Sequence, residues 1–336
     1  MPEASLRVWT TLERLPVEII QQVFLHCLEF NLPRASIHLA RALSYPILYT
    51  WIIRLAFSSP IKPSGQPFFT RDFLPEPLDF FSVPPQQRRD LQRAVLDCRW
   101  CTLPLMRRCQ REYVEHAIRR RCGDLEFSPS DYQTLLGNRV RPNVTGWWLG
   151  PQGQRQSEDL ILEATVRGSN AKFQVQAWPN YGAFKVFRSA GQLYDDSDIY
   201  QLPYGTKLPT RMPDKLLCPP WTESKMGFLK LLAPGAYIDE ERDHPRSGRV
   251  LRQLIRDRDF TTFKQLVDMH IRVKWSKYPI EWPILKNHYL VALKYADERN
   301  DPFVKLLVDM RWGEIPADDV KLKDKLMANM TTNSLE

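Results

Sequence analysis

Long apolar runs are missing from this sequence, since no stretch of its 336 residues approaches the ~20 consecutive apolar residues that a membrane-spanning helix requires. The amino-terminal residues also lack the basic and then apolar pattern of a secretory signal. We therefore expect a protein of the cytoplasm, the nucleus or both, with no membrane partner. Six cysteines in an intracellular chain of this length do not indicate a disulfide framework, so we expect reduced and mostly buried thiols.

Glycine is scarce, with 14 residues against 27 prolines. This balance favours many short helices that begin at prolines over a glycine-rich barrel. Apolar residues make up 43% of the chain and charged residues 26%, which is typical of a globular protein and argues against global disorder. The net charge of +8 raises the possibility of an acidic partner, nucleic acid included, although charge alone is weak support.

Sequence motifs of common catalytic sites are also missing. The chain contains no Walker loop and no GxGxxG, GxSxG or HExxH segment. A catalytic triad can be assembled from residues far apart in the chain, so such a site is not excluded. The histidines show no metal-ligand spacing with one another: His26, His38, His116, His244, His270 and His288. We expect a protein that is not an enzyme, with no catalytic residues, no metal site and no cofactor.

The segment 10–58 contains three short amphipathic helices. The first follows Leu15-Pro16, where proline suits a helix start because its missing N–H would have no partner there. Breaks at Pro33 and Pro46 start the second and third helices. The apolar stripe of the first helix consists of Ile19, Ile20, Val23, Phe24, Cys27 and Leu28. So small a unit cannot bury all its apolar faces, so the rest of the chain or a partner should cover some of them.

These residues, LERLPVEIIQQVFLHC followed by NLPRASIHLARALS and an aromatic third helix, resemble the F-box of fungal-type proteins. The second helix departs from the commoner pattern, which begins with an aspartate. The resemblance implies docking on the Skp adaptor of cullin-based ubiquitin ligases. The implied Skp-binding residues are Leu15, Pro16, Ile19, Ile20 and Phe24. The alternative is an amphipathic helical cap without a partner.

The middle of the chain changes character twice. We interpret residues 59–90, rich in proline and phenylalanine, as a connector that packs on the protein surface, and 91–145 as helical. Residues 146–210 alternate between apolar and polar, with turn sequences between the runs, which predicts a small antiparallel sheet. This segment contains three tryptophans, which we expect in the core and not on a recognition surface: Trp147, Trp148 and Trp178.

Two features of the helical segment 91–145 admit a second interpretation. Cys98-x-x-Cys101 with Cys109 and Cys122 suggests a zinc site, but the last two are not a closely spaced pair, so buried thiols are favoured. The segment also has more arginines than carboxylates, with Arg119-Arg120-Arg121 as the densest run. Because aromatic residues are not interleaved with this arginine run as base stacking would require, a solvated face of mixed charge is favoured over nucleic-acid binding.

Residues 211–325 contain an internal repeat. The segment 264–269, KQLVDM, returns as KLLVDM at 305–310, and FLKLL at 228–232 is a looser copy. A second short apolar helix accompanies each copy, and this arrangement indicates stacked helix pairs. LLAPGAYID at 231–239 resembles the end of an ankyrin repeat, so we describe the repeats as degenerate and ankyrin-like. Ordinary helical hairpins are the alternative.

The sequence thus predicts an α+β, mainly helical protein: an F-box-like three-helix module, middle helices with a small antiparallel sheet, and carboxy-terminal helix pairs. The two resemblances together imply a substrate-recognition adaptor of a Skp–cullin–F-box ubiquitin ligase, with Skp, the cullin core and an unknown protein target as partners. The first alternative is an interaction scaffold unconnected to ubiquitin. The second is a nucleic-acid-binding protein that uses the arginine-rich helices.

Overall fold

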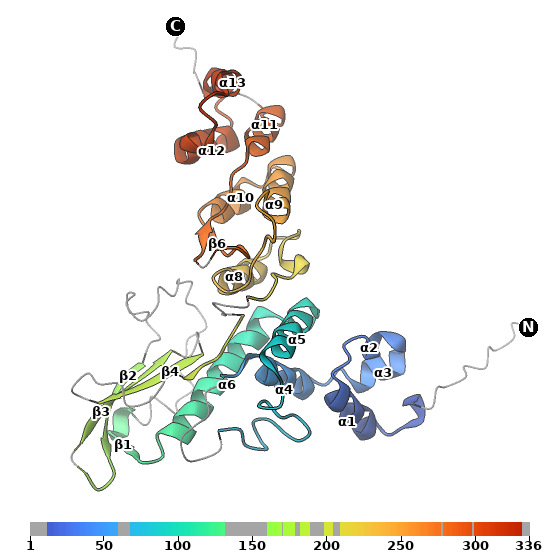
Figure 1. Ribbon diagram of the computed structural model, residues 1–336, viewed down its shortest axis with the longest axis vertical. Coiled ribbons are helices and arrows are strands. Elements are labelled where there is room, and N and C mark those ends of the chain that lie inside the picture. Colours follow the sequence, from blue (N-terminus) through green and yellow to red (C-terminus); the bar gives the residue numbers. More distant parts are fainter. Residues whose placement is uncertain are drawn as a thin grey trace, which may run out of the picture. The chain divides into compact units, whose positions relative to one another are not determined.

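The computed structural model describes residues 12–59, 68–131, 160–169, 171–178, 182–188, 198–203, 209–276, 278–297 and 299–330. The chain divides into two compact units, Met1–Leu202 and Pro203–Glu336 (Figure 1). Helices dominate both units, and the first also holds an antiparallel sheet, so the α+β, mainly helical class is confirmed. The division falls close to the predicted start of the repeats at 211. Among the described residues, no helix is both long and apolar enough to cross a membrane.

The amino-terminal helices lie where the sequence predicts them, except that the second is divided. They are α1 (Val17–Cys27), α2 (Leu32–Ala35), α3 (Ile37–Ala42) and α4 (Pro46–Phe57), after a short 3-10 turn at Leu12–Arg14. Ser36 separates α2 from α3 because its backbone is extended, at φ −159° and ψ 162°. Its hydroxyl accepts a hydrogen bond from the N–H of Leu39, which caps α3.

The first three of these helices form a small core, whereas α4 does not belong to it. Helix α1 packs against α3, and the Gln21 amide donates to the Ala42 carbonyl at 2.9 Å. The main packing partners of α4 are instead α5 (Pro85–Asp97) and α6 (Leu103–Arg121). Helix α4 is apolar on nearly all sides, with Ile52, Ile53 and Phe57 fully buried, and a three-helix module is too small to cover it. The predicted boundary at residue 58 therefore does not separate α4 from the helices after it.

The proline- and phenylalanine-rich connector packs on the helices in its described part, as predicted. Phe68, Phe73 and Phe80 are buried. Arg54 of α4 lies 4.4 Å from the Phe73 ring centroid and donates to the Phe73 carbonyl at 2.9 Å. The connector is therefore fastened to α4 by aromatic packing and by a cationic hydrogen bond.

The sheet is antiparallel throughout, in the order β1-β2-β3-β4-β5. Its strands are β1 (Leu125–Phe127), β2 (Leu160–Val166), β3 (Lys172–Trp178), β4 (Ala183–Arg188) and β5 (Asp198–Ile199). Val175 in the central strand lies opposite Leu162 and Val186, and α6 packs against β4. The predicted sheet is confirmed, but β1 lies within the segment predicted as helical, because its pairing with β2 is remote in sequence. Trp178 is half-buried, and Trp147 and Trp148 lie outside the described residues.

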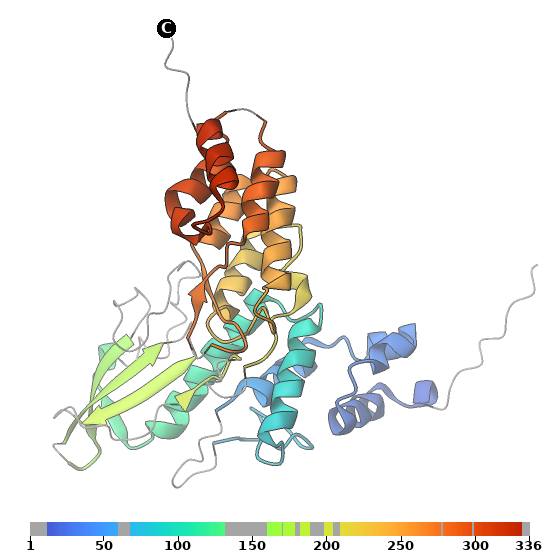
Figure 2. The same cartoon turned by 45° about the horizontal axis from the view of Figure 1, so that its top comes forward.

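The carboxy-terminal unit consists of stacked helix pairs, as predicted. After α8 (Glu223–Leu232), the pairs are α9 (Pro245–Arg256) with α10 (Phe260–Val267) and α11 (Lys286–Lys294) with α12 (Pro302–Arg311). Helix α13 (Val320–Met330) follows, and a hairpin of β6 (His270–Ile271) and β7 (Ile280–Glu281) joins the two pairs. Figures 1 and 2 show α9 beside α11, and α10 also packs against α12. The likeness of these pairs to ankyrin repeats stays a prediction.

The turn between the two helices is equivalent in both pairs, and in neither does a glycine occupy the left-handed position. Arg258 and Asn300 both adopt left-handed backbone conformations, with φ of 57° and 60°, at the positions that precede the second helix of each pair. The next residue in each case, Asp259 or Asp301, caps that helix with its carboxylate. Arg258 also forms an ion pair with Asp301, so the turn of one pair is bonded to the turn of the next.

Candidate functional site

The five residues that the F-box resemblance implies for Skp binding fall into an exposed group and a buried group. Leu15, Pro16 and Ile19 are exposed, with Leu15 at 36% and Ile19 at 45% of full exposure. Ile20 at 0% and Phe24 at 4% are instead buried in the chain. Because adjacent residues on a helix point about 100° apart, one flank of a wide apolar stripe packs inward and the other faces solvent. Ile20 and Phe24 are therefore not part of the surface that a partner could contact.

The exposed flank of α1 includes a residue that the resemblance did not imply. Val23 is 37% exposed and lies one helical turn after Ile19, on the same face. Leu15 lies just before the helix, four residues before Ile19. We call Leu15, Ile19 and Val23 the N-terminal ridge. The spacing of four residues is the sequence signal that identifies Val23, once Ile19 is known to be exposed.

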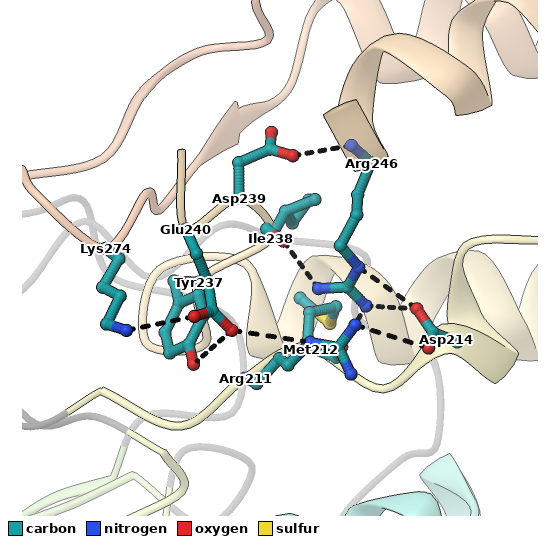
Figure 3. Close-up of polar contacts among 9 residues, drawn as sticks. All are labelled: Arg211, Met212, Asp214, Tyr237, Ile238, Asp239, Glu240, Arg246 and Lys274. Atoms are coloured by element: carbon teal, nitrogen blue, oxygen red, sulfur yellow. Dashed lines mark hydrogen bonds and ion pairs between the residues drawn. The ribbon is translucent and has the colours of Figure 1, made fainter. Parts of the chain in front are cut away.

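The carboxy-terminal unit contains a dense cluster of charged side chains around Arg246 (Figure 3). The Arg246 guanidinium donates to the Ile238 and Met212 carbonyls, both at 2.6 Å, and to the Asp214 carboxylate at 2.5 Å. Burial alone would raise the pKa of Asp214, but the hydrogen bond and charge of Arg246, helped by Arg211, hold that pKa below its usual value. Arg246 thus joins the start of α9 to two preceding segments and has its donors satisfied within the protein.

A second part of the same cluster is centred on Glu240. Its carboxylate lies 3.1 Å from the Lys274 ammonium and accepts a hydrogen bond from the Tyr237 hydroxyl at 3.2 Å (Figure 3). The Nε atom of Arg211 lies 3.9 Å from Oε1 of the same carboxylate. The Lys274 hydrogen bond is the main reason that the pKa of Glu240 is lowered. With each charge opposed by another, the cluster holds the segments together and offers no unmatched group for a ligand.

Asp239, His244 and Ser247 lie together, which superficially suggests a catalytic triad. The Ser247 hydroxyl, however, donates to Asp239 at 2.5 Å instead of to a histidine, and Ser247 is fully buried. The imidazole Nδ1 of His244 lies 3.5 Å from the same carboxylate. A nucleophile requires an accessible hydroxyl with a base to accept its proton. Here the hydroxyl is buried, and the carboxylate that accepts from it has a lowered pKa, which makes it a poor base. The arrangement holds the start of α9 instead.

The four cysteines that suggested a zinc motif are buried or half-buried free thiols. Cys101, Cys109 and Cys122 are buried and Cys98 is half-buried. Burial raises the pKa of the Cys109 and Cys122 thiols to about 12, which suppresses the thiolate that zinc requires. Within the described residues, no group of three or more metal-ligating side chains is placed to hold a metal ion.

Thiol labelling tests this assignment. We expect a maleimide to modify Cys27 and Cys218, which are exposed, within minutes at neutral pH, and to leave Cys101, Cys109 and Cys122 unmodified until the chain is unfolded. Mass spectrometry of peptides from the native and the urea-unfolded protein measures both populations. Rapid native labelling of Cys109 would contradict the buried-thiol assignment.

The arginines of α6 that the sequence left open to nucleic acid are partly engaged by carboxylates. Glu112 lies 2.9 Å from Arg54 and 3.6 Å from Arg108, and Glu115 lies 4.0 Å from Arg119. This is the mixed-charge face that the sequence favoured. Arg54 is largely buried, whereas the more exposed pairs, Arg108–Glu112 and Arg119–Glu115, contribute only about 0.5 kcal/mol each. All three pairs reduce the local positive charge.

Scans of this chain against protein-family models, curated proteins and solved structures found no match.

Proposed function

We propose that this protein is a substrate-recognition adaptor of a Skp–cullin–F-box ubiquitin ligase, which binds Skp through its amino-terminal helices and a protein target through its carboxy-terminal unit. The N-terminal ridge is the observation that carries the proposal. Three large apolar side chains, Leu15, Ile19 and Val23, are exposed beside a sequence that resembles the F-box. The adaptor would act in the cytoplasm, the nucleus or both.

The chemistry of such an adaptor lies in binding. Burying an exposed apolar side chain against a partner contributes roughly 1.5–3 kcal/mol at full burial, so three half-exposed side chains suffice for a modest interface core. The adaptor holds its target close to a ubiquitin donor, which raises the effective concentration of the target without an acid, base or nucleophile of its own. A scaffold unconnected to ubiquitin is the competing function.

Skp binding by the full-length chain tests the proposal. We expect the parent chain to bind purified Skp, and the Ile19→Asp/Val23→Asp variant to lose at least about a hundredfold in affinity, because each change places a charge in an apolar contact. Isothermal titration calorimetry measures the affinities. Ile20 is unsuitable for this test because an aspartate there would disrupt the core of the α1–α3 unit.

The matched control is Leu290→Asp/Val320→Asp, which places the same two charges at exposed apolar residues of α11 and α13 in the other unit. We expect it to bind Skp as the parent does. Failure of the parent chain to bind Skp would contradict the adaptor function and favour the scaffold. Equal affinity of the parent and the ridge variant would remove the ridge from the contact.

A further inference from the structure

Helices α9 and α11 have a one-sided charge. They pack against each other, and neither contains an aspartate or a glutamate: their sequences are PRSGRVLRQLIR and KNHYLVALK. On α9, Arg249 and Arg256 are exposed and Arg252 is half-buried, opposite the face that carries Leu251 and Leu254 into the core. On α11, Lys294 is exposed. We call the three arginines of α9, Arg249, Arg252 and Arg256, the basic face.

The three arginines of the basic face are aligned by helical geometry. Residues three, four and seven apart share one face of a helix, and seven residues rise about 10 Å. Gly248 also shapes this face, because a Cβ there would lie 3.2 Å from Arg252 Nη1 and 3.3 Å from Leu285 Cδ1. The missing side chain leaves room for the Arg252 guanidinium at the junction of α9 with α11.

The charge of these arginines is not matched within the described residues. None of the three forms an ion pair there, in contrast to Arg246 on the same helix. Asp257, one residue after Arg256, accepts from Gln253 at 2.8 Å, and Asp297 forms an ion pair with Arg258 at 3.2 Å. Arg249 helps to lower the pKa of Asp214 but is not bonded to it.

We propose that the basic face binds an acidic polypeptide segment, rich in aspartate or glutamate, of a partner protein. Guanidinium groups form paired hydrogen bonds with carboxylates, and a row of them about 10 Å long fits the carboxylates of a short extended peptide. Helix α11, which packs against α9, exposes the apolar side chain of Leu290, which would suit an apolar residue between the acidic ones.

The features of the basic face favour a polypeptide over a nucleic acid. Binding of single strands relies on aromatic side chains that stack on bases, and α9 has none. Tyr295, the exposed aromatic residue at the end of α11, already has a cation over its ring, because the Lys294 ammonium lies 5.7 Å from the ring centroid. Three arginines also make a small set compared with the six to ten or so phosphate contacts of typical DNA-binding proteins.

This inference rests on the proposed function only in naming the acidic segment as part of the target. Skp binding depends on α1, whereas the acidic segment would bind α9 and α11. The two experiments use variants in different units, so failure of one leaves the result of the other interpretable.

Peptide binding by the full-length chain tests the inference. The probe is a fluorescein-labelled peptide of alternating glutamate and leucine, measured by fluorescence anisotropy, beside a labelled single-stranded oligodeoxynucleotide of equal length. The variant is Arg249→Gln/Arg252→Gln/Arg256→Gln. The control is Lys264→Gln/Lys305→Gln/Lys325→Gln, which removes the same number of charges from exposed positions on α10, α12 and α13.

We expect the parent to bind the peptide more tightly than the oligonucleotide, with an affinity that falls as salt rises. The arginine variant should bind the peptide at least about tenfold more weakly, because charge-assisted hydrogen bonds are lost, while the lysine control changes by less than about twofold. No peptide binding by the parent, or equal weakening in both variants, would overturn the inference. Tighter binding of the oligonucleotide, lost in the arginine variant, would overturn it in favour of nucleic acid.

Discussion

Replacing Asp239 by alanine is expected to destabilise the carboxy-terminal unit by about 3–5 kcal/mol, the range observed when one partner of a buried charged network is removed. Asp239 is fully buried. Its carboxylate accepts hydrogen bonds from the backbone N–H of Arg246 at 2.8 Å and of Ser247 at 3.3 Å, and from the Ser247 hydroxyl. These N–H groups belong to the first turn of α9, where a helix leaves its donors without partners.

Asp239 therefore caps α9 from outside the helix. The residue at the usual capping position, His244, has a left-handed backbone and provides no side-chain cap. Burial tends to raise the pKa of Asp239, but the His244 imidazole 3.5 Å away and the hydrogen bonds from Ser247 and the backbone N–H groups outweigh it and hold the pKa below its usual value. The carboxylate stays charged at neutral pH, and its contribution is lost only as the pH falls below the ordinary range of an aspartate.

Hydrogen exchange of the α9 amides measures the effect of Asp239→Ala locally, which suits a chain of two units that need not unfold together. Asp239→Asn is the control, since its amide oxygen still accepts from the backbone while the charge is gone, and we expect about half the loss. A change below about 1 kcal/mol in the alanine variant would show that Asp239 does not hold the start of α9.

Lowering the pH from 6.5 to 4 is expected to weaken the α9–α11 contact by up to about 3 kcal/mol through the single residue His288. Its Nδ1 accepts from the N–H of Leu285 at 2.8 Å, and its Nε2 lies 3.0 Å from the Gly248 carbonyl of α9. Burial is the main reason that its pKa is lowered from 6.5 to about 4, and the charge of Arg252 adds to the shift against the opposing Gly248 hydrogen bond.

The sign of this pH dependence follows from proton binding. Between pH 6.5 and 4 the unfolded chain protonates His288 while the folded chain keeps it neutral, so acid favours unfolding in that window. Protonation would also place a donor on Nδ1, which has to accept from Leu285. The stabilising effect is complete above pH 6.5 and is lost as the pH approaches 4.

Hydrogen exchange of the α9 and α11 amides, measured across this range, tests the second prediction. We expect protection in the parent to fall steadily with acid, and His288→Gln to start from lower protection and show little change with pH. The same acid response in both proteins would assign the effect to another group. Exchange of the α10 amides provides an internal comparison. Helix α10 also packs against α9, but the hydrogen bonds of His288 are made with Leu285 and Gly248.

Much of the local structure could be predicted from the sequence because its signals lie within a few residues of one another. The prolines at 16, 33 and 46 lie at helix starts, and the alternation of Phe173, Val175 and Ala177 describes the buried face of β3. The echo of 264–269 at 305–310 identified the equivalent ends of α10 and α12, since repeated segments bury equivalent faces.

The surface available to Skp could be predicted only in part. The stripe on α1 contains both Ile19 and Ile20, and periodicity alone cannot show which flank packs inward. That choice depends on α3, and it exposed Ile19 and Val23 while burying Ile20 and Phe24. Helix α4 was likewise expected within the amino-terminal module but packs on α5 and α6, which come dozens of residues later in the chain.

The sequence by itself determined the helix starts, the alternation of the strands and the repeat, because each depends on backbone preferences and on periodic burial. Tertiary structure alone decided the capping of α9 by Asp239, the exposed flank of α1 and the exposure of the arginines on α9. Each of these depends on which distant residues lie nearby to accept a hydrogen bond, cover an apolar side chain or neutralise a charge. Such neighbours leave no periodic signal in the chain, so they could be recognised only once the helices were packed.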